Sequence, residues 1–250
     1  YCLNALAAKP PPLDSFPYLP FPSVNGELKR RNALAPNQTP NLSLQDAGRI
    51  LRHSVMWVFD RGPVLLSAIR FVREVMEEHR HSVLSERRVT DLATSYARQR
   101  LRDEVPNSSW LTEEPFNCNH GSHSLGHYLD MLLFGAATLV GINHGRRVNE
   151  VIGTDLPYGL YYGCLKPYAH SIHEWTLDIY CEKGWKEYRQ LPANAIVAQV
   201  VTLLENFSNE FLPFGAGPRA PAENIDAARL EKLFVTRRIS VAGFRGGTMV

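Results

Sequence analysis

The chain has 250 residues, of which 44% are hydrophobic and 10% aromatic, so it can bury a substantial core as one domain with extensions. Its formal net charge of +2 and the lack of a long block of like charge argue against a nucleic-acid-binding protein. The four cysteines form no C-x-x-C pair, which predicts reduced thiols in a matrix or cytosol.

Residues 1–42 are rich in proline, with Phe16, Tyr18 and Phe21 between the prolines. Proline fixes φ and lacks an N–H, so we expect an extended arm rather than a helix. The aromatic side chains favour an arm that lies along its own domain or a neighbouring subunit. The first residue is Tyr rather than Met, which is compatible with a cleaved organellar presequence.

The next hundred residues predict amphipathic helices. Ser43 and Asp46 predict a capped helix start, and the helix should end near residue 60 because Gly62-Pro63 follows. Apolar residues at a spacing of three or four predict a second helix, residues 63–81, with its charged face in solvent. A third helix is expected over residues 91–104.

The second half of the chain predicts more helices, over residues 122–141, 147–153, 195–212 and 222–235. Residues 157–190 are expected to form helices with breaks, since no alternation of apolar and polar residues is sustained. The longest apolar run, residues 131–142, is too short to span a bilayer. We therefore predict a mainly α fold: an arm (residues 1–42), one helical domain (43–212) and a C-terminal extension (213–250) with a short helix and a basic, Gly-rich tail.

Histidines concentrate in the stretch from residue 118 to residue 173. His120, His123 and His127 are spaced i, i+3 and i+7, so they share a helical face if the helix begins early enough. Three imidazoles could hold zinc, and candidates for a further ligand are Cys118, His144, His170, His173 and Glu174.

Other features disfavour a metal. Neither Asp130 nor Glu150 has a histidine at the Glu-x-x-His spacing of a di-iron bundle, and histidines at a helix start also serve as caps. We therefore expect no cofactor and regard zinc as the weaker alternative. For His127 alone, we expect a buried helical histidine bonded to a backbone carbonyl.

Several segments occur in the order and at the spacing of a known family. They are Leu84-Ser85-Glu86-Arg87-Arg88-Val89, His127 with Gly135, Glu150 with Thr154 and Leu156-Pro157, Pro167, and Ile179-Tyr180-Cys181-Glu182-Lys183-Gly184-Trp185. Together they span roughly residues 45 to 190, and this stretch resembles the coenzyme Q biosynthesis protein 4 family. The resemblance implies a helical mitochondrial protein on the matrix face of the inner membrane, without a transmembrane helix, and a hydrophobic channel for a long isoprenoid chain.

The metal motif of that family, His-Asp-x-x-His followed after eleven residues by Glu, is degenerate in this chain. Aligned on the glycine, its positions become His127, Tyr128, Met131 and Asn143. A thioether is a poor ligand for a hard or borderline divalent ion, and Asn brings no charge. In the other register, Ser124 replaces the aspartate and Leu139 the glutamate. The resemblance therefore implies a family member that has lost its metal ligands and kept the scaffold.

A retained groove could still hold a lipid or quinone tail, and its candidate lining residues are Leu133, Phe134, Tyr158, Tyr161 and Tyr162. Tyrosines in this pattern are more typical of core and interface aromatics than of a cofactor cage. Three functions stay open. The first is a non-catalytic accessory subunit of a respiratory complex or ATP synthase, with other subunits and membrane lipid as partners. The second is a ubiquinone-biosynthesis enzyme or scaffold acting at C1 of a polyprenylated benzoate ring. The third is an unrelated His-rich metalloprotein.

Overall fold

The structure, a computed structural model, describes residues 43–113, 116, 123–168, 174–182, 185–216, 228–238 and 245–247. The chain divides into two compact units, Tyr1–Asp46 and Ala47–Val250. In the described end of the first unit, the Ser43 hydroxyl accepts a hydrogen bond from the Asp46 N–H at 3.0 Å, which confirms the predicted helix cap. The arm predicted for residues 1–42 lies outside the described residues.

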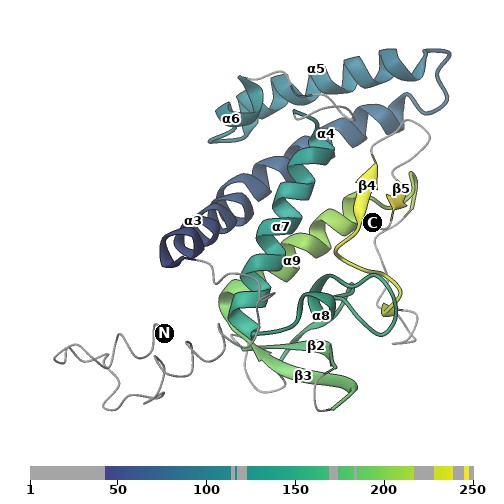
Figure 1. Cartoon of the computed structure of the whole chain (residues 1–250). Helices are drawn as coiled ribbons and strands as arrows, with labels where there is room; N and C mark the ends of the chain where they lie inside the picture. The colour runs from purple at the N-terminus through teal and green to yellow at the C-terminus, as the bar shows by residue number, and fades with distance from the viewer. Residues whose placement is uncertain are drawn as a thin grey trace, which may run out of the picture. The chain divides into compact units, whose positions relative to one another are not determined.

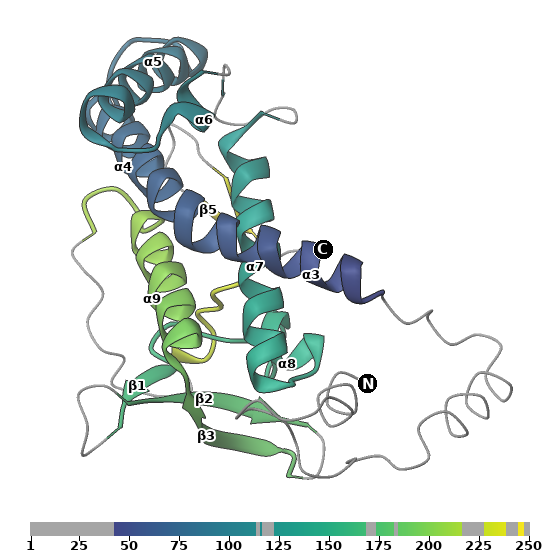
Figure 2. The same cartoon turned by 90° about the vertical axis from the view of Figure 1, so that its left-hand side faces the viewer.

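One continuous helical segment leads into the second unit. It consists of α3 (Leu44–Val55), the π-helix η1 (Met56–Arg61) and α4 (Gly62–Glu78) (Figure 2). The predicted break at Gly62-Pro63 is wrong, because Gly62 has helical dihedrals, φ −56° and ψ −50°. Pro63 has no N–H to donate, and it falls in the first turn of α4, directly after the wider turns of η1. The change of hydrogen-bond pattern lets the helix continue past the proline.

The core forms where α4 meets α5 (Glu86–Glu104), α7 (Leu125–His144) and α9 (Ala195–Glu210) (Figure 1). The amphipathic pattern predicted for α4 is confirmed, since Leu65, Ile69 and Met76 are fully buried. α5 begins at Glu86, one turn before the predicted start, and α9 matches its prediction closely. A Cβ atom on Gly62 would lie 2.7 Å from Leu203 Cδ2, so glycine permits the close approach of α9.

Between α5 and the sheet, α7 is the long helix, and it is flanked in sequence by two short ones. α6 (Ser109–Thr112) and α8 (Val148–Ile152) are single turns on either side of it. α7 begins where the Ser124 hydroxyl accepts the His127 N–H, and it ends at Gly145, whose φ is +60°. By length and composition α7 could cross a membrane, and 44% of its apolar window is buried inside the fold.

A three-stranded antiparallel sheet replaces the broken helices predicted for residues 157–190. Its order is β1 (Leu165–Pro167), β2 (Trp175–Cys181) and β3 (Glu187–Ala193). The prediction was wrong because β2, the central strand, has three consecutive buried residues and so shows no alternation. Pro167 and Pro192 lie in the edge strands, where a missing N–H is tolerated.

The C-terminal segment returns to this sheet region. Residues 229–235 form turns and a bridge between Tyr161 and Lys232, so the helix predicted over residues 222–235 is wrong for its second half. Its first half, residues 222–227, lies outside the described residues. β4 (Thr236–Arg238) and β5 (Arg245–Gly247) then pair antiparallel within the stretch predicted as a basic tail. The described chain is thus mostly helical with a small sheet.

Candidate functional site

The histidine-rich stretch does not form the predicted helical face. The Ser124 cap starts the helix at Leu125, so His123 lies before the helix and His127 lies in its first turn. Cys118, His120, His170 and His173 lie outside the described residues. Among the residues that the structure does describe, no three His, Cys, Asp or Glu side chains are grouped so that they could hold a metal ion.

His127 is exposed, which contradicts the expectation of a buried histidine. Because the helix begins only two residues earlier, its side chain stays at the surface near Asp130. Partial burial raises the pKa of the Asp130 carboxyl above its usual value, and the charge of His127 opposes the shift. His144, the predicted further ligand at the other end of α7, is half-buried, and burial followed by the charge of Arg146 lowers its pKa.

The four positions aligned with the metal motif point to separate places. Met131 and Asn143 are twelve residues apart on one helix, which separates them by about 18 Å. Tyr128 turns into an aromatic cluster, where its ring centroid lies 5.6 Å from that of Trp110. The Asn143 side chain donates to the Leu139 carbonyl and accepts from Asn194, the cap of α9. The other register, with His127 and Leu139, has the same twelve-residue separation.

The five residues proposed for a lipid groove are also dispersed. Leu133 is buried in the core and Phe134 is 60% exposed, although they are neighbours on α7. Tyr158 and Tyr161 contact the rings of Tyr180 and Tyr188 respectively, at centroid distances of 5.5 and 6.3 Å. Tyr158 and Tyr161 thus pack against the sheet, and none of the five lines either of the two described cavities.

A buried polar network joins the sheet to the C-terminal segment. The Tyr161 hydroxyl donates to Asp178, and the Arg229 guanidinium lies 3.6 Å from the same carboxylate oxygen and 3.4 Å above the Tyr188 ring. Burial and the hydrogen bond to Asp178 raise the pKa of Tyr161. Lys232 donates to the Tyr158 carbonyl at 2.5 Å, and burial lowers its pKa. These paired groups fasten the C-terminal segment and offer no open reaction site.

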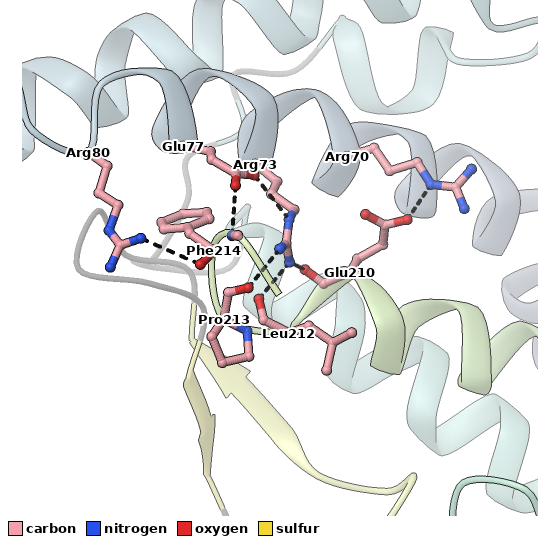
Figure 3. Close-up of polar contacts among 9 residues, drawn as sticks. Arg70, Arg73, Glu77, Arg80, Glu210, Leu212, Pro213 and Phe214 are labelled. Carbon is pink, nitrogen blue, oxygen red and sulfur yellow. Dashed lines mark hydrogen bonds and ion pairs between the residues drawn. The ribbon is translucent and has the colours of Figure 1, made fainter. Parts of the chain in front are cut away.

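A basic face on α4 resembles an anion site and serves another purpose (Figure 3). Arg73 donates to the carbonyls of Glu210, Leu212 and Pro213. Arg70 pairs with the Glu210 carboxylate at 2.5 Å. The last carbonyls of a helix lack intrahelical partners, and cations stabilise that end. Arg73 therefore caps the C-terminus of α9, and Arg70 pairs with the side chain of its last residue.

An exposed apolar surface surrounds the crossing of α3 and α7. A Cβ atom on Gly135 would lie only 3.2 Å from the Ser54 carbonyl oxygen, so the two helix backbones are in close contact (Figure 2). Within one turn of these two residues lie four exposed apolar side chains, here called the crossing surface: Leu51 (38% exposed), Val55 (41%), Met131 (37%) and Phe134 (60%). Exposed apolar side chains that flank one helix crossing are candidates for an interaction site.

The sequence reasoning missed a second feature, which is built on η1. Arg61, the last residue of η1, places its guanidinium carbon 4.6 Å from the Trp57 ring centroid and 4.8 Å from that of Trp110. The two indole rings meet edge to face, with centroids 5.8 Å apart. A cavity of about 570 Å³ lies beside them. The signal in the sequence was a proline inside an otherwise continuous apolar helix pattern.

Comparison of the chain with protein-family models, with curated proteins and with solved structures gives no match. The crossing surface and the cavity beside η1 are the two features of the described residues that indicate a function.

Proposed function

We propose that this chain is a non-catalytic accessory subunit of a large mitochondrial inner-membrane complex, a respiratory complex or ATP synthase, on the matrix side. The single observation that carries the proposal is the crossing surface. Fully burying an apolar side chain of this size contributes about 1.5–3 kcal/mol, and completing the burial of a partly exposed one contributes a corresponding fraction. Four such side chains around one helix crossing give a partner subunit an apolar anchor.

The dispersed motif positions support a scaffold role. Restoring an aspartate at Tyr128 and a histidine at Met131 would leave Asn143, the fourth motif position, about 18 Å from Met131, since both lie on one helix. This arrangement differs from a converging metal motif, so the resemblance to the coenzyme Q biosynthesis protein 4 family supports the proposal only through the order and spacing of the other sequence segments. The role proposed for the chain is then architecture, and its partners are other subunits and membrane lipid.

Native electrophoresis of gently solubilised mitochondria tests the proposal. The chain is expected to migrate with a large complex, and its deletion is expected to destabilise that complex while ubiquinone levels stay normal. Migration as a free monomer would contradict the proposal. Loss of ubiquinone with accumulation of a ring-modified precursor would favour the enzyme of quinone biosynthesis instead.

Metal analysis of the purified full chain distinguishes the third alternative. A His-rich metalloprotein would retain stoichiometric zinc and lose it on His123→Ala or His127→Ala. His53→Ala, on the exposed part of α3, is the matched control, since it removes an imidazole far along the chain from the histidine cluster. Zinc that follows His123 and His127 but not His53 would overturn the assignment as a metal-free subunit.

A further inference from the structure

The cavity beside η1 has the size and lining of a small-molecule site. Its volume is about 570 Å³, within the range of roughly 300–1,000 Å³ that is typical of ligand pockets. Met56, Phe59, Val64 and Val105 supply apolar walls, while Asp60 and Arg61 supply charge. An apolar body with one polar end is the kind of ligand that such a lining accommodates.

The π-helix itself forms one wall of this cavity. A π-turn is rare, and such turns occur frequently at functional sites. Here the wider turns end at Arg61 and present Met56, Phe59, Asp60 and Arg61 to one cavity. The helical distortion therefore builds the wall and places its cation.

Arg61 differs from the arginines on α4. The guanidinium groups of Arg70 and Arg73 bind oxygen atoms at the C-terminal end of α9. In the described part of the chain, no carboxylate or carbonyl pairs with Arg61. Its guanidinium is held by the faces of Trp57 and Trp110 instead. Ring contacts leave the N–H groups at the edge of the guanidinium plane without acceptors.

Trp110 carries a second unused donor. Its indole Nε1 is buried and has no hydrogen-bond partner among the described residues. A buried donor without an acceptor costs about 1–3 kcal/mol. Trp110 and Arg61 both line the cavity and contact each other, so a ligand oxygen bound by Arg61 would lie beside the indole ring.

We propose that this cavity binds a small organic carboxylate with an apolar body, such as a medium-chain fatty acid. The carboxylate accepts hydrogen bonds from the Arg61 guanidinium beside the Trp110 ring, and the chain lies against Met56, Phe59 and Val64. The exposed Asp60 carboxylate lies next to Arg61, so it disfavours ligands of dense negative charge such as polyphosphates. This site is independent of the crossing surface.

Titration calorimetry of the full chain with decanoate, and with decanol as the neutral probe, tests the proposal. Decanoate is expected to bind saturably at one site and decanol at least tenfold more weakly, since a hydrogen bond to a charged group contributes about 1.5–3 kcal/mol. Arg61→Gln is expected to weaken decanoate binding at least tenfold. Arg52→Gln, an exposed arginine on α3 outside the cavity, is the control and should leave binding unchanged.

A second measurement tests the same site in the protein that keeps Arg61. The indole N–H resonance of Trp110, assigned by its loss in Trp110→Phe, is expected to move on addition of decanoate and to stay in place with decanol. Absence of saturable decanoate binding would overturn the site. Equal affinity for decanol, unchanged affinity in folded Arg61→Gln, or binding that leaves the Trp110 resonance unmoved would overturn it as well.

Discussion

The two faces of α7 have similar apolar side chains and different surroundings. On one face Leu125, Leu132 and Leu139 are buried against the other helices, and on the other Met131 and Phe134 are exposed. A helix that is apolar all round is normally buried all round. The exposed face of α7 is therefore more apolar than a solvent-facing helix surface normally is. Substitutions on the two faces are expected to differ in their effect on the free energy of unfolding.

The largest effect is expected on the buried face. Leu132→Ala removes a side chain that is fully buried, so the lost contacts and the cavity left behind should reduce the free energy of unfolding by about 2–5 kcal/mol. Urea denaturation of the purified chain measures this. A loss below about 1 kcal/mol would show that α7 is not held in the core as described.

The helix crossing should be sensitive to volume. Gly135→Val places a Cβ about 3.2 Å from the Ser54 carbonyl oxygen, tighter than ordinary contact, and we expect a cost of about 1–3 kcal/mol. Gly141→Ala is the matched control, since no atom lies within 4 Å of its Cβ. The control should be neutral or stabilising by up to about 1 kcal/mol, because alanine favours a helix. Equal melting temperatures for the two variants would contradict the close crossing.

A smaller effect follows from Asp130. Its pKa is raised in the folded chain, chiefly by burial, so the carboxyl contributes most favourably below its unfolded pKa and loses that contribution as pH rises through its folded pKa. Asp130→Asn should therefore raise the melting temperature at pH 7 and have little effect near pH 3. A gain of the same size at both pH values would exclude ionisation as the cause.

The smallest effect on stability is expected on the exposed face. Phe134→Glu should change the free energy of unfolding of the isolated chain by no more than about 0.5 kcal/mol, because the side chain has few contacts to lose. Under the proposed function, the same variant should fail to join the large complex on a native gel. Val83→Glu is the control: Val83 is a fully exposed apolar residue in the turn after α4, and this variant should assemble normally.

The helical core could be predicted from the sequence because its pattern is local. The spacing of Leu65, Ile69 and Met76 predicts one buried face, and the structure confirms it. The sheet could not be predicted in this way, since β2 is buried without alternation and its partners are set by tertiary pairing, as between Leu177 and Leu191. The helix break predicted at Gly62-Pro63 was wrong for a related reason. The π-helix directly before it lets the helix continue past the proline.

The candidate sites depended even more on three-dimensional context. The spacing of His123 and His127 predicts a shared face only if one helix includes both residues. The helix begins after the Ser124 cap, so it includes His127 and not His123. Arg61 and Trp110 are far apart in sequence, and nothing in their spacing indicates that the guanidinium lies against the indole. The crossing surface was also hidden, because exposure of Phe134 beside buried Leu133 follows from the packing partners of α7.

Site-specific photo-crosslinking in mitochondria tests the central claim most directly. A photoreactive phenylalanine analogue is placed at Phe134 in the crossing surface and, as the control, at Val83 in the exposed turn after α4. The account predicts a discrete adduct with one subunit of a large inner-membrane complex from position 134 and none from position 83. Adducts of equal yield at both positions, or none at position 134, would contradict it.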